Sequence, residues 1–129
     1  MSTPPETKVF QGWLTKRGGS RGIGFKTYKR RYFVWTTLGL SYYSNEQAYI
    51  KQQTELGFLD TNGLTMRRIN PEQGKEDRFE FEFITKSRVL LVRAKDEQQR
   101  TEWLSAYDHF CSLKDHGKVL DDVDVGKSN

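Results

Sequence analysis

The sequence contains little cysteine and no long apolar run. Its single cysteine, Cys111, excludes an internal disulfide framework and fits a reducing compartment. The longest aliphatic stretch covers residues 89–92, far short of the roughly 20 residues that a membrane-spanning helix needs. The first residues are polar and proline-containing, which is not the pattern of a secretory signal peptide. These absences predict a soluble, cytoplasmic protein.

Acidic residues are missing from one early segment, and cations are concentrated there. The 129-residue chain has a net charge of +4, yet residues 8–31 hold eight lysines or arginines and no acid. The remainder carries 13 cations and 17 acids. One basic face on a mildly acidic body favours the binding of an anion. The alternative is a solvated charged surface, which is what most charge runs are.

Most of the chain has the pattern of short β-strands. Seven segments are alternating or rich in aromatic and β-branched residues, namely 9–17, 28–36, 38–44, 56–60, 64–69, 78–84 and 88–94. In the clearest of them, Phe79, Phe81 and Phe83 alternate with glutamates. The Thr-Asn-Gly segment at residues 61–63 predicts a type I′ hairpin turn between the fourth and fifth strands.

The pattern changes to that of a helix near the C-terminus. Asp96 predicts a helix N-cap, and Gln99 stands three residues later in the capping-box position. An apolar stripe follows at helical spacing: Trp103, Tyr107, Phe110 and Cys111. The cysteine is therefore interpreted as a small core residue and not as a nucleophile.

This order of elements predicts a mainly β fold. A meander of seven antiparallel strands buries its apolar face by curling into a partly open barrel or sandwich. The C-terminal amphipathic helix then caps one open end. We expect one domain over residues 9–113, between a disordered leader (1–8) and a flexible tail (114–129).

Four motifs in this order resemble the pleckstrin-homology family over about residues 9–113. They are Gly12-Trp13-Leu14-Thr15-Lys16 in the first strand, Lys29-Arg30-Arg31-Tyr32-Phe33-Val34 in the second, Leu40-Ser41-Tyr42-Tyr43 in the third and Trp103 in the last helix. Each motif is weak alone, but four in the right order at credible spacings are specific. The resemblance implies the same barrel-and-helix fold and a module that binds phosphorylated inositol lipids.

The basic hairpin supports anion binding without the resemblance. Lys29 and Arg31 are two residues apart in a strand and project to the same face, and Lys16 can approach them from the antiparallel neighbour. Arginine offers phosphate a planar fork of donors, and lysine offers a mobile charge. The connecting loop contains four glycines, which can turn backbone N–H groups toward a phosphate or simply mark a mobile hairpin tip.

The resemblance makes the expected site more specific. Lys16 with the Lys29-x-Arg31 pattern is similar to family members that bind 3-phosphorylated inositides, and Tyr43 is expected to donate its hydroxyl to a ring phosphate. One departure is the gap of twelve residues between Lys16 and Lys29, slightly longer than is usual in the family. The other cations of the hairpin are possible additional ligands: Arg17, Arg21 and Lys26. Ile23 and Phe25 are candidates for contact with the membrane.

Competing functions receive less support from the sequence. No catalytic arrangement is recognisable, and His109 and His116 are too few for a metal site, so we expect no enzyme activity, metal or cofactor. A protein-interaction or scaffold module is the main alternative, because a fold does not fix a function. The confinement of the basic charge to one hairpin argues against nucleic-acid binding. The expected partners are phosphoinositide lipids or soluble inositol phosphates and an anionic membrane, with reversible recruitment to the inner face of the plasma membrane.

Overall fold

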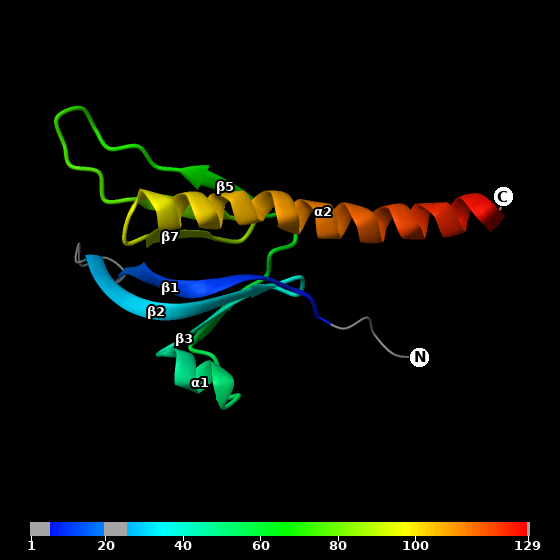
Figure 1. Cartoon of the computed structure of the whole chain (residues 1–129), viewed down its shortest axis with the longest axis horizontal. Helices are drawn as coiled ribbons and strands as arrows, with labels where there is room; N and C mark the ends of the chain where they lie inside the picture. The colour runs from blue at the N-terminus through cyan, green and yellow to red at the C-terminus, as the bar shows by residue number, and fades with distance from the viewer. Residues whose placement is uncertain (1–5, 20–25, 129) are drawn as a thin grey trace.

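A computed structural model describes residues 6–19 and 26–128, with side chains as far as Lys114 except that of Lys26. The chain forms one antiparallel sheet, a short helix and a long C-terminal helix (Figure 1). In chain order the elements are β1 (Lys8–Gly19), β2 (Lys26–Thr36), β3 (Leu40–Tyr43), α1 (Glu46–Ile50), β4 (Gly57–Leu59), β5 (Thr65–Arg68), β6 (Glu80–Ile84), β7 (Val89–Arg93) and α2 (Glu97–Ser128).

The sheet has seven strands in the order β4-β3-β2-β1-β7-β6-β5. Its centre is the long β1–β2 hairpin, and β1 also pairs with β7, through Thr15 and Arg93 and through Lys16 and Val92. The edge strands β4 and β5 are consecutive in sequence but lie at opposite ends of the sheet. The barrel is therefore not closed, as the sequence predicts.

The predicted hairpin between the fourth and fifth strands is wrong. Thr61 and Leu64 do form a turn, in which the amide of Leu64 donates to the carbonyl of Thr61. In that turn Gly63 takes a left-handed conformation (φ 73°), but Asn62 does not, whereas a type I′ turn needs both. The turn instead sends the chain from one edge of the sheet to the other.

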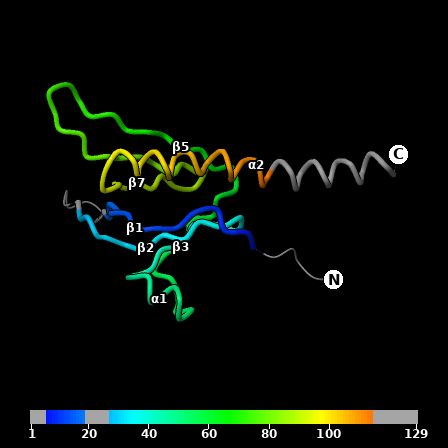
Figure 2. The backbone as a smooth tube through the Cα atoms, viewed as in Figure 1, coloured from blue at the N-terminus to red at the C-terminus, as the bar shows by residue number. Residues whose placement is uncertain are grey.

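Helix α1 has no counterpart among the predicted elements. Asn45 caps it, since its side-chain oxygen accepts a hydrogen bond of 2.8 Å from the amide of Ala48. The small side chain of Ala48 is buried beneath the helix. The helix packs against β3, on the side of the sheet that faces away from α2 (Figures 1 and 2).

Helix α2 begins at the predicted cap. The side chain of Asp96 accepts from the amide of Gln99 at 2.8 Å, and the Gln99 side chain accepts from the amide of Lys95 at 2.7 Å. Gln99 also donates to the carbonyl of Trp13, which ties the start of the helix to β1. The helix runs on to Ser128, through the segment predicted to be a flexible tail.

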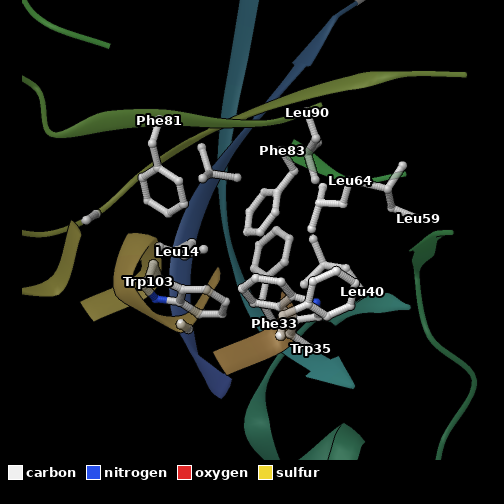
Figure 3. Close-up of a cluster of buried hydrophobic side chains, with 14 residues drawn as sticks. Leu14, Phe33, Trp35, Leu40, Leu59, Leu64, Phe81, Phe83, Leu90 and Trp103 are labelled. Atoms are coloured by element: carbon white, nitrogen blue, oxygen red, sulfur yellow. The ribbon is translucent and has the colours of Figure 1, made fainter. Parts of the chain in front are cut away.

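Trp103 is the centre of the core (Figure 3). Its side chain is fully buried, and its ring lies 6.5 Å from the stacked ring of Trp35. Other aromatic rings surround it from both halves of the sheet, namely Phe10, Phe33, Phe81 and Phe83. The helix therefore holds β1 and β2 against β6 through one side chain.

A buried arginine fixes the beginning of α2 to the connection between β5 and β6. The Arg100 side chain has no exposed surface and makes ion pairs with Asp77 (2.6 Å) and Glu97 (2.5 Å). It also donates to the carbonyl oxygens of Ile69 and Glu80. The hydrogen bond from Arg100 lowers the pKa of Asp77 below its ordinary value. Such a paired charge tolerates burial because its donors are occupied.

We predict that Trp103→Ala destabilises the domain by about 3–5 kcal/mol, because it removes a fully buried indole and leaves a cavity. Denaturant unfolding measures the effect. Glu102→Ala, at the exposed neighbouring position, is the control and should change stability by less than about 0.5 kcal/mol. Equal stability of the two variants would contradict this account of the core.

Candidate functional site

The inner face of the β1–β2 hairpin changes from apolar to basic along its length. Leu14 and Phe33 are buried in the core on this face. In the same register Leu14 stands opposite Arg31, and Lys16 stands opposite Lys29. Because alternate residues of a strand share a face, these three cations continue the core face beyond the part that α2 covers. The predicted convergence of Lys16, Lys29 and Arg31 is present.

These cations line a pocket of about 310 Å³, here called the basic pocket. Its lining residues come from the two strands of the hairpin and from β3 and the start of β4: Lys16, Gly18, Thr27, Lys29, Arg31, Tyr42 and Leu56. Lys29 is exposed, whereas Lys16 and Arg31 are half-buried. Among the described residues that line it, none is acidic, three carry a positive charge, and Thr27 and Tyr42 each carry a neutral hydroxyl group.

Gly18 keeps one wall of the basic pocket open. A Cβ atom at this position would lie 3.0 Å from the hydroxyl oxygen of Thr27 and 3.9 Å from the ammonium of Lys16. The Thr27 hydroxyl meanwhile donates to the carbonyl of Gly18 at 3.4 Å. A larger residue would therefore occupy the space between the cations.

Tyr42 forms an aromatic wall of the basic pocket. The Lys16 ammonium lies 5.2 Å from the centre of its ring, in a cation–π contact that holds the lysine toward the pocket. The other neighbour of the ring is Phe33, at 5.3 Å between centroids, so the wall rests on the core. Gly57 pairs with Tyr42 and leaves room for the ring, because a Cβ there would lie 2.2 Å from the tyrosine hydroxyl.

The prediction that Tyr43 belongs to this site is not supported by the strand register. Tyr42 pairs with Phe33, whose side chain is in the core, and Tyr43 pairs with Tyr32. Directly opposed residues share a face, so Tyr42 faces the basic pocket and Tyr43 faces the other side of the sheet. The sequence held a signal for this, because the apolar Leu40 marks the core face of β3, and Tyr42, two residues later, shares that face.

Of the remaining candidates, the described residues place the side chain of Arg17 alone, and it does not line the basic pocket. Arg17 is exposed and pairs with Tyr28 on the opposite face of the hairpin. Lys26 begins β2 opposite Gly19, and its side chain is outside the described atoms. Arg21, Ile23 and Phe25 lie outside the described residues. The proposed additional ligands and membrane contacts thus stay predictions.

Arg30 also lies on the opposite face, as alternation predicts. Its guanidinium lies 4.4 Å from the centre of the Trp13 ring, where it stacks on an aromatic surface and makes no ion pair in the described part of the chain. The ion pairs among residues 6–19 and 26–114 belong to arginines 67, 68, 93 and 100. The cations of the basic pocket therefore keep their charge for a ligand.

This arrangement suits a compact polyanion. An arginine fork and two lysines converge from a rigid hairpin, and hydroxyl and backbone groups lie beside them. Within the described residues there is no group of His, Cys, Asp or Glu side chains that could hold a metal ion. In the same part of the chain, no helix is both long enough and apolar enough to cross a membrane.

Comparison with known proteins identifies the fold. The family model described as PH domain matches residues 8–112. The chain belongs to the PH domain family. A PH domain is a binding module and carries no catalytic machinery of its own.

Relatives and solved structures agree with this assignment. The PH domain is 33% identical over 104 residues to a RAC family serine/threonine-protein kinase homolog of Dictyostelium discoideum, covering 81% of this chain and 21% of that protein. It is 28% identical to Pleckstrin homology domain-containing protein 1 of Arabidopsis thaliana, covering 88% and 74%. The C-terminal PH domain of pleckstrin, solved in complex with D-myo-Ins(1,2,3,5,6)P5, matches with a TM-score of 0.60 at 25% identity, covering 81% and 95%.

The chain spans only a small part of the first curated relatives that it matches. It covers 5% of Arf-GAP with Rho-GAP domain, ANK repeat and PH domain-containing protein 2 of Homo sapiens, and 21% of the kinase homolog.

We predict that Gly57→Ala destabilises this PH domain by about 1–3 kcal/mol, because the new Cβ displaces the Tyr42 ring from Phe33. Denaturant unfolding measures the loss, and the ring resonances of Tyr42 report the displacement. Gly12→Ala is the matched control. Its Cβ would lie at an ordinary 3.8 Å from the Trp103 ring, so a change below about 1 kcal/mol is expected. An unmoved Tyr42 ring in Gly57→Ala would contradict the prediction.

Proposed function

We propose that this PH domain binds phosphorylated inositol headgroups in the basic pocket and thereby recruits its parent protein to anionic membranes. The observation that carries the proposal is the convergence of Lys16, Lys29 and Arg31 on one pocket, with no acid among its described lining residues. A phosphoinositide headgroup carries several phosphates on one rigid ring. Several cations on a rigid hairpin match such a ligand better than they match a single carboxylate.

Two solved structures of one neighbour support the ligand class. The C-terminal PH domain of pleckstrin was solved with D-myo-Ins(1,2,3,5,6)P5 and with D-myo-Ins(1,2,3,4,5)P5. The shared chemistry is an inositol polyphosphate, either free or as the headgroup of a lipid. The membrane proposed for recruitment is the inner face of the plasma membrane, whose anionic lipids add about 1 kcal/mol of attraction per cation near the surface.

The pocket is proposed to favour headgroups that carry a 3-phosphate. Lys16 and Lys29 stand opposite each other, and Arg31 lies one alternate position farther along β2 toward the core. Charges held at different depths can contact phosphates on different ring positions. A misplaced phosphate would leave Arg31 desolvated and unpaired, which costs about 1–3 kcal/mol. Tyr42, in place of Tyr43, supplies the aromatic wall from β3.

We expect Arg31→Ala to weaken headgroup binding by about ten- to a hundredfold, because it removes charge-assisted hydrogen bonds to phosphate. Titration calorimetry with a soluble inositol polyphosphate at physiological salt measures the loss. Arg30→Ala is the matched control, since it removes the same charge from the adjacent residue on the opposite face. Its binding should stay within about threefold of wild type, in keeping with a screened surface charge. Wild-type binding by Arg31→Ala would instead favour the alternative of a protein-interaction domain without lipid specificity.

The 3-phosphate preference is tested with isomers of equal charge. The domain should bind liposomes containing phosphatidylinositol 3,4-bisphosphate at least about tenfold more tightly than liposomes containing the 4,5-isomer. A tenfold difference corresponds to the free-energy cost of leaving one buried charge unpaired. Both liposomes carry the same mole fraction of lipid and are compared at physiological salt. If the two isomers bind equally, recognition depends on total charge alone.

A further inference from the structure

Three tyrosines form a cluster on the face of the sheet opposite the basic pocket. The Tyr49 ring of α1 lies 5.4 Å from the Tyr43 ring of β3 and is stacked at 6.1 Å from the Tyr32 ring of β2. The side chains of Tyr43 and Tyr49 are half-buried, so their rings are partly accessible. Helix α1 thus creates an aromatic surface that the strands alone would not have.

A pocket of about 270 Å³ lies beside these rings and is here called the tyrosine pocket. It is lined by Glu6, Lys8, Val34, Thr36, Ser41, Tyr43 and Tyr49. The ammonium of Lys8 lies 5.6 Å from the centre of the Tyr49 ring. The chain's own exposed lysine therefore already makes the cation–π contact that this surface offers.

Carboxylates lie in and beside the tyrosine pocket, whose described lining holds one acid, Glu6, and one cation, Lys8. Glu6 lines it, and Glu46 accepts a hydrogen bond from the Tyr32 hydroxyl at 3.4 Å. The pKa of Tyr43 is raised, first by burial and then by the charge of Glu55. The pKa of Tyr32 is raised as well, first by burial and then by the charge of Glu46. The carboxylates beside the rings are the part of this effect that also favours a bound cation.

Apolar side chains extend the same surface. Phe58 stands opposite Ser41 in the β3–β4 pair, and so shares the face of the tyrosine pocket; it is 46% exposed. Ile50, at the end of α1, is 57% exposed. Aromatic, acidic and apolar groups therefore lie together on a surface that the rest of the described chain leaves open.

We propose that the tyrosine pocket is a docking site for a partner protein and receives an arginine or lysine side chain of an extended segment of that partner. The aromatic rings offer cation–π contacts to a guanidinium or ammonium group, and Glu6 in the lining accepts its N–H groups. The charges of Glu46 and Glu55 act on the neighbouring tyrosines. A trimethylammonium lipid headgroup matches less well, because it has no N–H to donate. The adjacent Phe58 offers the apolar contact area that a peptide can use and a small cation cannot.

The position of the pocket allows both sites to be occupied together. Lys8 pairs with Thr36 at the end of the hairpin away from its turn, whereas Lys16 and Lys29 lie toward the turn and on the other face. A partner bound at the tyrosine pocket would therefore not contact a ligand held by the basic pocket. The docking site stands independently of the proposed headgroup binding.

The test uses the whole chain and a fluorescein-labelled octapeptide of alternating arginine and glycine, with a glutamate–glycine octapeptide for comparison. The net charge of +4 repels a basic peptide overall, so saturable binding requires a local site. We expect Tyr49→Ala to weaken binding about two- to fivefold, and Tyr43→Leu combined with Tyr49→Ala to weaken it about tenfold. Lys8→Met should strengthen it about two- to fivefold, because the competing internal cation is gone.

Controls separate this site from general charge effects. Tyr28→Ala removes an exposed tyrosine that packs on Arg93 elsewhere, and Glu102→Gln removes an exposed acid of α2. Both variants should bind the peptide as wild type does, and Tyr49→Ala should keep wild-type binding of inositol polyphosphate. No saturable binding, or equal binding by wild type and by all three pocket variants, would overturn the proposal. The proposal would also be overturned if Tyr49→Ala lost binding to phosphatidylcholine vesicles but still bound the peptide. That result would assign the pocket to a lipid cation.

Discussion

The contact of Trp103 with both halves of the sheet is the interaction on which the rest of the structure depends. The sheet is open, and β1 joins β7 through only two residue pairs. Backbone hydrogen bonds alone would leave β1–β4 and β5–β7 weakly joined. The indole of α2 contacts Phe33 and Trp35 on one side and Phe81 and Phe83 on the other. Hydrophobic burial by the helix thus replaces the hydrogen bonds that barrel closure would have supplied.

The same strands build the core and the candidate ligand site. On the inner face of the hairpin, Leu14 and Phe33 are buried while Lys16 and Arg31 stand one alternate position farther on. The helix covers only part of this face, so the charged groups on the uncovered part keep contact with water: Lys29 is exposed, and Lys16 and Arg31 are half-buried. The cations are consequently held by strands that the core makes rigid. A rigid support matters because a polyanion gains most from donors that need no reordering on binding.

The two faces of the hairpin present different chemistry. The inner face ends in the basic pocket, whose cations are not engaged in the ion pairs of the described chain. The outer face toward α1 carries tyrosines and carboxylates. Successive residues of a strand point to opposite faces, so the neighbours Tyr42 and Tyr43 line different pockets. The two proposed sites therefore lie on opposite faces of a single pair of strands.

Local patterns were enough to predict much of this protein. The alternation of Phe81 and Phe83 with glutamates and the capping pair of Asp96 and Gln99 depend on near neighbours in sequence, and they correctly indicated β6 and the start of α2. Phe79, predicted to belong to the same strand, lies before β6 in a left-handed conformation (φ 59°). The concentration of cations in residues 8–31 also indicated Lys16, Lys29 and Arg31 as candidate ligands. Alternation within β2 sets the common face of Lys29 and Arg31, and the register of β1 with β2 brings Lys16 to that face.

Other features depended on contacts between distant segments, and only the tertiary structure decided them. The strand register assigned Tyr42 to the basic pocket and Tyr43 to the opposite face. Sheet order separated β4 from β5, although an Asn-Gly turn lies between them. The burial of Arg100 required Asp77 and two carbonyl oxygens from other elements. The periodicity of a sequence indicates which residues share one face of a strand. What that face packs against is fixed only when the strands pair and the helix packs on the sheet.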